Sequence, residues 1–91
     1  MHPWHEAAEA GNLEKLRALL KDNPDLVFSK DGHGWTPLHH AAEEGYKGPM
    51  ELLLAHKAEV NARTNNGETP LHLAAYWAYK DLVKLLLAGR P

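Results

Sequence analysis

The sequence predicts an all-α fold, a short solenoid in which helical repeats stack side by side. The main observation is a repeated stretch, since residues 69–75 nearly copy residues 36–42. When residues 31–58 are laid onto residues 64–91, 13 of the 28 aligned pairs are identical, whereas chance would give roughly one or two. Two further observations support this fold. Some residues are of the types that begin helices, and leucines recur at helical spacing.

The repeated stretch contains the residues that begin a helix. Thr36 and Thr69 are good N-caps, because a threonine hydroxyl accepts a hydrogen bond from a free N–H in the first turn. Pro37 and Pro70 follow at the first helical position, where the missing N–H costs nothing and φ is already preset. The alanine pair that ends each copy keeps the helix thin, so a neighbouring helix can approach closely.

The repeated stretch resembles the helix-opening motif of ankyrin repeats, and the distance between its two copies equals the ankyrin period of about 33 residues. The resemblance covers nearly the whole chain. It implies an ankyrin-repeat solenoid, with three helix-turn-helix repeats joined by projecting β-turns. We expect a single domain over residues 1–91, with an N-terminal repeat at 1–30, a second repeat at 31–63 and an incomplete C-terminal repeat at 64–91.

The N-terminal third of the chain shows a weaker copy of the pattern. Residues 1–11 match residues 35–45 in part, and first repeats are commonly atypical because one side has no neighbour. Residues 12–21 carry leucines at helical spacing on one face. Asn23 and Pro24 end this helix, because proline cannot continue the turn. The apolar residues 26–28 are expected to fold under the first helix pair.

The second repeat is expected to place its first helix at residues 37–44, with Gly45 as the C-terminal stop. Its second helix should begin near Pro49, because proline fits the first helical position better than a helix interior. Lys57 stands where the ankyrin family has a stop glycine. A lysine there must adopt a positive φ at a cost on the order of 1 kcal/mol, or the turn must differ.

The third repeat follows a predicted turn. Residues 60–67 resemble the β-turn that projects between ankyrin repeats, and Asn66 with Gly67 supplies the turn signal. The repeat opens at Thr69, and its last helix is expected over residues 80–88. We therefore expect six helices in three antiparallel pairs. The core positions expected on the first helices are Leu38, Ala41, Ala42, Leu71, Ala74 and Ala75.

Composition limits the classes of partner. The net charge is −2 and the pI is near 6.4, so no electrostatic attraction to nucleic acid is expected. The chain has no cysteine, which excludes a disulfide framework and a thiolate metal site. No apolar run approaches the roughly 18 residues of a membrane span, and no signal peptide opens the chain. We therefore expect a cytoplasmic or recombinant soluble protein without a membrane partner.

The residue patterns of known catalytic sites are missing. Ser29 is the only serine, and it lies in a polar loop without a strand-to-helix elbow. No glycine-rich loop for phosphates follows a strand, and His5 lacks the second histidine of the zinc-protease signature. The paired acids Glu43 and Glu44 lie on a helix, where a solvated face is the default. The sequence predicts no enzyme, no cofactor and no small-molecule substrate.

The chain has seven histidines, so metal binding must be weighed. In the ankyrin family the motif histidine, here His5, His39 and His72, holds the turns through hydrogen bonds to the backbone, which is a structural role. His2 and His5 have a spacing that could share a metal, although unspecific affinity at a terminus is the simpler explanation. His40 and a glutamate three or four residues later also have a possible ligand spacing. A histidine metal site therefore remains the weaker alternative.

Aromatic residues point to a binding surface. By helical spacing Tyr76 and Trp77 lie on the face that corresponds to the concave contact face of ankyrin proteins, and Trp35 lies at a projecting turn. Exposed clusters of this kind match the composition of binding hot spots, although Trp77 could fold back onto the stack and Tyr79 could serve packing. We expect the partner to be another protein. The expected anchors are Trp35, Tyr76, Trp77 and Tyr79, and the expected polar surround is His33, His40, Glu43, Glu44 and Glu68.

The last helix offers a second candidate surface, because its leucine face has no further repeat to cover it. Truncation of a longer array, docking of a partner and self-association across a two-fold axis are the competing explanations. Irregular substitutions in otherwise regular repeats indicate a surface remodelled by evolution or by design. These residues are Gly48, Pro49, Met50, Lys57 and Ala78. The alternative function is thus an engineered ankyrin scaffold that associates with itself as a homodimer.

Overall fold

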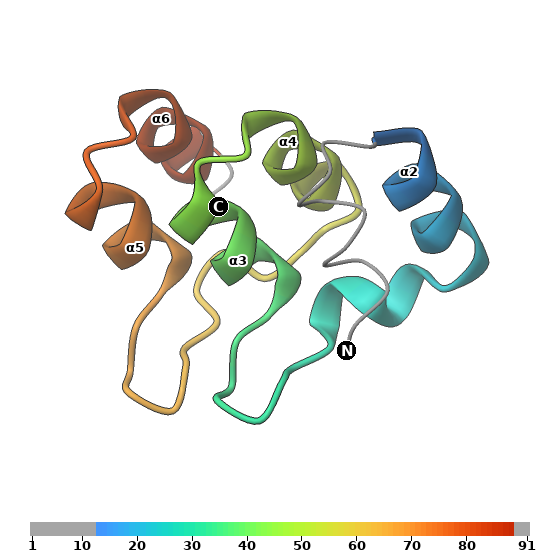
Figure 1. Cartoon of the computed structure of the whole chain (residues 1–91), viewed down its shortest axis with the longest axis horizontal. Coiled ribbons are helices and arrows are strands. Elements are labelled where there is room, and N and C mark those ends of the chain that lie inside the picture. Colours follow the sequence, from blue (N-terminus) through green and yellow to red (C-terminus); the bar gives the residue numbers. More distant parts are fainter. Residues whose placement is uncertain (1–12, 89–91) are drawn as a thin grey trace.

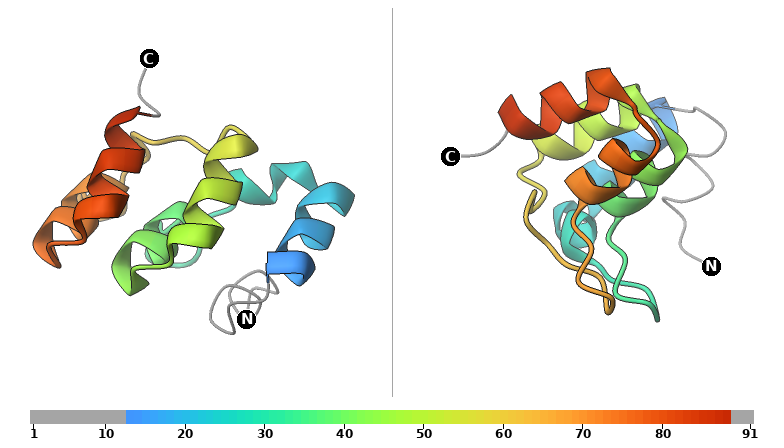
Figure 2. Two further views of the ribbon diagram at one scale, coloured as in Figure 1. Left: turned by 90° about the horizontal axis from the view of Figure 1, so that it is seen from above. Right: turned by 90° about the vertical axis from the view of Figure 1, so that its left-hand side faces the viewer.

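The computed structural model describes residues 13–88, and all regular secondary structure in that range is helical. The elements in chain order are α2 (Leu13–Asp22), the 3-10 helix η1 (Pro24–Phe28), α3 (Pro37–Glu44), α4 (Lys47–Ala55), α5 (Pro70–Tyr76) and α6 (Lys80–Ala88). Helices α3 and α5 lie side by side in one layer (Figure 1). Helix α4 lies between α2 and α6 in the other layer (Figure 2).

This stacking confirms the expected all-α solenoid. Five α-helices are described, and the sixth, expected in the N-terminal segment 1–11, lies outside the described residues. Helix α3 packs against α4, the second helix of its own repeat, and against α5, the first helix of the next repeat. Between residues 13 and 88, no helix is both long and apolar enough to cross a bilayer.

The predicted helix starts are confirmed in both complete motifs. The Thr36 hydroxyl accepts the N–H of His39 at 3.4 Å, and the Thr36 N–H donates to His39 Nδ1 at 3.1 Å. Thr69 and His72 make the same pair of hydrogen bonds at 3.3 and 3.0 Å. Each pair satisfies two N–H groups that a helix start leaves free, which explains why α3 and α5 begin immediately after their threonines.

A residue in the left-handed conformation follows α3, α4 and α5, and it is glycine only after α3. Gly45 ends α3 in the left-handed conformation, with φ of 75°. Lys57 after α4 has φ of 65°, so of the two expected alternatives the lysine adopts the positive φ, and Ala78 after α5 has φ of 59°. Non-glycine residues adopt this conformation at a cost of about 1 kcal/mol each. The turns after α4 and α5 therefore keep the left-handed conformation, although Lys57 and Ala78 disfavour it.

Helix α4 begins at Lys47, two residues before the position predicted from Pro49. The first helical hydrogen bond is the one from the Met50 N–H to the Tyr46 carbonyl, at 3.0 Å. Pro49 therefore stands where no N–H is needed, and the whole first turn tolerates proline rather than its first position alone.

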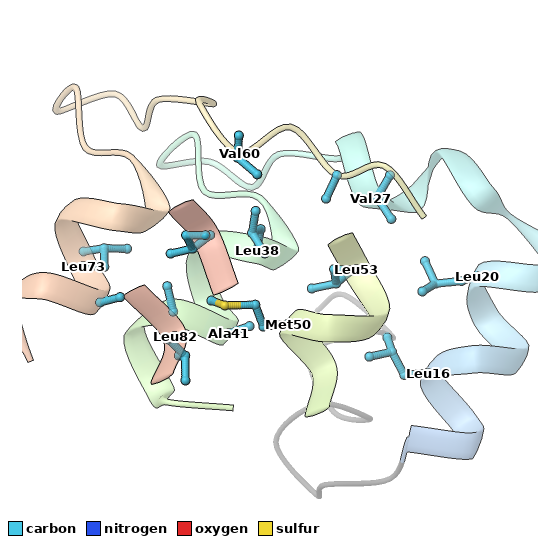
Figure 3. Close-up of a cluster of buried hydrophobic side chains, with 14 residues drawn as sticks. Leu16, Leu20, Val27, Leu38, Ala41, Met50, Leu53, Val60, Leu73 and Leu82 are labelled. Atoms are coloured by element: carbon cyan, nitrogen blue, oxygen red, sulfur yellow. The ribbon is translucent and has the colours of Figure 1, made fainter. Parts of the chain in front are cut away.

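One apolar core runs through the stack. Figure 3 shows it as a continuous cluster from Leu16 of α2 to Leu73 of α5. Burying a leucine side chain stabilises a fold by roughly 1.5–3 kcal/mol, so this cluster is the main source of stability. Its large buried side chains are Leu16, Leu20, Val27, Leu38, Met50, Leu53, Leu73, Leu82 and Leu86.

The apolar segment before the second repeat is only partly buried. Val27 is buried, as expected, within η1 under α2 and α3. Phe28 is 54% exposed, so its predicted place under the first helix pair is wrong. A 3-10 helix has three residues per turn and sends successive side chains in different directions, so consecutive apolar residues cannot all face one core.

The third repeat is less buried than the second at matched positions. Leu38 and Ala42 are fully buried, whereas Leu71 is half-buried and Ala75 is exposed. Helix α5 covers α3, but within residues 13–88 no helix packs on the opposite side of α5. The prediction of a core position is therefore wrong for Ala75 and only partly right for Leu71.

Two turns project from the same side of the stack and hydrogen-bond to each other (Figure 1). The second turn is closed by the Gly67 N–H, which donates to the Thr64 carbonyl at 2.9 Å and confirms the predicted turn. The Asn65 N–H donates to the His33 carbonyl at 3.0 Å and joins the two tips. A Cβ on Gly34 would lie 2.6 Å from Asn65 Oδ1, so this pairing requires glycine.

Candidate functional site

A groove made of two adjoining pockets lies in the angle between the first helices and the projecting turns. Glu43 lines both pockets, so they form one strip that crosses from α3 to α5. The first pocket is lined by Asp31, His33, Trp35, His40, Glu43 and Glu44. The second pocket is lined by Glu43, Asn66, Glu68, His72, Leu73, Tyr76 and Trp77. We call this strip, with both sets of lining residues, the acidic–aromatic groove.

The structure brings eight of the nine expected binding residues together in this groove. Tyr79 lies apart from them. Its half-buried ring packs over Gly45, where an added Cβ would lie 3.0 Å from the ring, and it lines a separate depression at the start of α6. Tyr46, at the same position one repeat earlier, is likewise half-buried against the core.

Asp31 fixes the turn that forms one wall of the groove. Its Oδ1 accepts the N–H groups of His33 at 2.9 Å and Trp35 at 3.0 Å, while Oδ2 contacts His40 Nε2 at 3.0 Å. Desolvation raises the pKa of Asp31, but the hydrogen bonds from His40, Trp35 and His33 outweigh it and lower that pKa to about 2. Asp31 is therefore a carboxylate at physiological pH and holds the turn against α3.

Trp35 contributes an aromatic wall that is only partly exposed. Its ring centroid lies 5.0 Å from that of His40 and 5.9 Å from that of His39, in tilted geometry. The indole also packs against the edge of the core. This double contact fixes the ring in place, so a partner would meet it without further ordering of the side chain.

Tyr76 and Trp77 form the most exposed aromatic pair in the described part of the chain. Their ring centroids are 5.0 Å apart in an edge-to-face arrangement, with Tyr76 78% exposed and Trp77 50% exposed. The Trp77 Nε1–H donates to Glu43 Oε1 across the two repeats. The end of α5 is thereby tied to α3, and Glu43 is held at the junction of the two pockets.

The motif histidines His39 and His72 differ in their burial and in their hydrogen-bond partners. The Thr36 N–H donates to His39 Nδ1, so the proton of the neutral ring lies on Nε2, which donates to the Glu68 carbonyl at 2.9 Å. Burial lowers the pKa of His39 and keeps its ring neutral. His72 makes the same local bonds with Thr69, but its ring is exposed. His39 thus bonds to backbone groups of two repeats, and hydrogen bonds to the backbone are what the resemblance implies for a motif histidine.

Four lining residues were not predicted from the sequence. Asp31 carried a usable signal, since an aspartate at the start of a turn commonly accepts the N–H two residues later. Leu73 shares the helical face of Tyr76 and Trp77 but lies buried at the base of the groove. Asn66 and His72 had been assigned only to the turn and to the motif, and their place in the groove depends on how the repeats stack.

The histidine metal site gains no support from the described residues. Between residues 13 and 88, no three histidine or acidic side chains lie close enough to hold a metal ion. Both ring nitrogens of His39 are already hydrogen-bonded, to Thr36 and to Glu68. The histidine pair weighed at the N-terminus, His2 and His5, lies outside the described residues.

The sequence is similar to parts of several known proteins. Delta-latroinsectotoxin-Lt1a of Latrodectus tredecimguttatus is 47% identical over 62 residues, which cover 67% of this chain and 5% of the toxin. Protein phosphatase 1 regulatory subunit 27 of Homo sapiens is 40% identical over 58 residues, or 64% of this chain and 37% of that protein. Ankyrin repeat domain-containing protein 13C of Mus musculus is 38% identical over 63 residues, or 69% and 11%. The chain thus spans only a small part of these relatives.

The family match covers almost all of the sequence. The pattern described as ankyrin repeats, in three copies, matches residues 3–90. This agrees with the paired helices, the threonine-capped starts and the projecting turns of the structure. The chain therefore belongs to the ankyrin-repeat family.

Proposed function

We propose that this chain is a non-catalytic binding module that recognises another protein through the acidic–aromatic groove. Ankyrin repeats generally mediate interactions between proteins. One relative is named as a regulatory subunit, which agrees with a role in binding. The groove lining offers aromatic faces and hydrogen-bond acceptors but no serine or cysteine nucleophile, which suits recognition rather than bond-making chemistry.

The observation that carries this proposal is the preorganised aromatic pair of Tyr76 and Trp77 beside Glu43. Tyrosine and tryptophan dominate binding hot spots, because they bury a large area while losing little side-chain freedom. Here the two rings already contact each other, and the Trp77 indole is hydrogen-bonded. Trp35 supplies a third ring at the other end of the groove. Tyr79, which packs over Gly45, would contribute by supporting the start of α6 rather than as an anchor.

Selection of peptides from a random library displayed on phage, with the folded chain as bait, tests this proposal. Selected peptides are synthesised, and their dissociation constants are measured by fluorescence anisotropy. The double variant Tyr76→Ala/Trp77→Ala should weaken binding by about 2 kcal/mol or more, roughly thirtyfold. Phe28→Ala is the matched control, because it removes an exposed aromatic side chain outside the groove and should leave binding unchanged. Selected peptides that bind all three proteins equally would refute the proposal.

A second candidate function is self-association through the outer side of α5 and α6, which we call the end face. His39 and Ala42 are fully buried by the next repeat, whereas their counterparts His72 and Ala75 are exposed. Leu87 of α6 is 50% exposed, whereas Leu54, its counterpart in α4, packs against the core. A second copy of the chain could cover these residues and form a homodimeric scaffold.

Light scattering behind size exclusion distinguishes this candidate from the first. A dimer would show twice the 10.2 kDa mass of the chain. If Leu87→Glu restores the monomer mass, the end face is the interface. If Tyr76→Ala/Trp77→Ala restores it instead, the groove binds a second copy. A monomer at all concentrations would remove self-association from consideration.

A further inference from the structure

We infer that the segment which occupies the acidic–aromatic groove is cationic, an extended stretch of another protein that carries arginine or lysine side chains. This inference rests on the binding function proposed above and adds the chemistry of the partner. Three features of the groove support it, namely its unbalanced carboxylates, its aromatic faces and the fixed position of Glu43.

The groove carries carboxylates without a balancing cation. Asp31, Glu43, Glu44 and Glu68 line it, whereas no lysine or arginine belongs to either lining set. Within the described residues, none of the three glutamates forms an ion pair. Asp31 contacts His40 Nε2 at 3.0 Å, and the other imidazoles of the lining belong to His33 and His72. A cationic segment would therefore meet a surface of complementary charge.

The aromatic rings favour the same partner. The faces of tryptophan and tyrosine rings attract arginine and lysine head groups, and the aliphatic stems of these side chains pack on the rings. Trp35 stands at one end of the groove, and Trp77 with Tyr76 stands at the other. A segment that crosses from α3 to α5 would thus find an aromatic surface and a carboxylate in each pocket.

Glu43 is the central group of this arrangement. It lines both pockets, and the Trp77 Nε1–H holds its Oε1 in place. No hydrogen bond from residues 13–88 reaches its second carboxylate oxygen, which can therefore accept from a guanidinium or ammonium group. A fixed carboxylate beside an indole loses little freedom when a cation arrives, which favours binding at this point.

Other occupants fit the groove less well. An anionic segment, or a second copy of this net-negative chain that brings the same groove, would place like charges together. An uncharged apolar helix would remove the glutamate carboxylates from water without giving them a partner, which is unfavourable. A cationic segment satisfies both the charge and the rings.

Isosteric charge removal tests the inference. Glu43→Gln/Glu44→Gln/Glu68→Gln keeps the shape of the groove and leaves an amide oxygen to accept from Trp77. Glu14→Gln/Glu51→Gln/Glu59→Gln is the matched control, because it changes the net charge equally at exposed positions outside the groove. The probes are a short fluorescent peptide with arginine at alternate positions and the same peptide with glutamine in place of arginine.

We expect the arginine peptide to bind the natural chain and the glutamine peptide to bind at least about tenfold more weakly. The groove variant should weaken arginine-peptide binding at least about tenfold, and the control variant less than about twofold. Equal weakening by both variants would overturn the inference, because only the overall charge would then matter. So would equal binding of the two peptides, or no arginine-peptide binding at all.

The peptides selected by display separate this inference from the proposed function. Selected peptides that depend on Tyr76 and Trp77 and are rich in arginine or lysine support both. Selected peptides that depend on these rings but lack cationic residues would overturn the inference and leave the binding function intact. Selected peptides that ignore both the rings and the groove glutamates would overturn the proposed function itself.

Discussion

The two motif histidines provide a matched test of what the stacking of repeats contributes to stability. His39 and His72 stand at equivalent positions of successive repeats and make the same bonds with their threonines. Only His39 is buried, and only its Nε2–H reaches the carbonyl of Glu68 in the next repeat. Comparing His39→Ala with His72→Ala therefore cancels the shared cap and leaves the contribution of the inter-repeat contact.

The expected free energies follow from these contacts. His72→Ala removes part of the helix cap and should reduce the free energy of unfolding by about 1 kcal/mol. His39→Ala removes the same cap, deprives the Glu68 carbonyl of its donor at about 1–3 kcal/mol, and also leaves a cavity. We therefore expect His39→Ala to cost roughly 3–5 kcal/mol, a difference of at least about 2 kcal/mol between the variants.

Urea unfolding followed by far-ultraviolet circular dichroism measures both values. The slope of free energy against urea should be the same in all three proteins, so that midpoints report stability alone. If the free energies of unfolding of the two variants differ by less than about 0.5 kcal/mol, the bond between repeats contributes nothing measurable. The proposed role of His39 in stabilising the stack would then be refuted. A changed slope for His39→Ala would instead indicate altered compactness or loss of the two-state transition, and the midpoints would then no longer report stability alone.

The remaining predictions concern acid sensitivity, the core and the helix ends. Because burial lowers the pKa of His39 below the 6.5 of the unfolded chain, its contribution should be complete above pH 6.5 and decline as the pH falls below it. Urea midpoints at several pH values should thus show the gap between the natural chain and His39→Ala shrinking in acid, and a constant gap would contradict this. Leu53→Ala should cost roughly 2–5 kcal/mol by chemical denaturation, whereas Leu87→Ala on the half-exposed surface should cost under about 1 kcal/mol. If Leu53→Ala lowered the free energy of unfolding by less than about 1 kcal/mol, the assignment of Leu53 to the core would be wrong. Ala78→Gly should raise the thermal midpoint by relieving a positive φ worth about 0.5–1 kcal/mol, and Gly45→Ala should lower it, because φ is 75° there and Cβ would meet Tyr79 at 3.0 Å. An unchanged midpoint in either variant would show that these turns relax at no cost.

Local chemistry explains which features could be predicted from the sequence. The start of α3 follows from Thr36 and Pro37, its end follows from Gly45, and the structure has both where they were expected. Helix α6 has the predicted bounds of 80–88, because its leucine spacing and the preceding turn determine it. In each case the decisive residues are neighbours in the chain, so no knowledge of packing was needed.

Features that depend on packing between repeats could not be predicted in this way. Ala75 carries the same motif as Ala42, yet it is exposed, because exposure is decided by what covers the helix and not by the helix itself. The bridge from Asp31 to His40 exists only once the turn folds back onto α3. Proline is tolerated at each of the first three positions of a helix, so Pro49 alone does not determine at which residue α4 begins.

The groove shows how a repeat architecture turns a difference between repeats into a binding surface. Stacking at a fixed period places equivalent residues of successive repeats side by side, so a position that is acidic in one repeat and aromatic in the next yields an adjacent acid and ring. Glu43 and Glu44 of the second repeat correspond to Tyr76 and Trp77 of the third. The contact between Glu43 and Trp77, which lie in different repeats, follows from that substitution and from the stacking. The core positions must stay alike for the repeats to stack, whereas these surface positions are free to diverge, so specificity can change without loss of the fold.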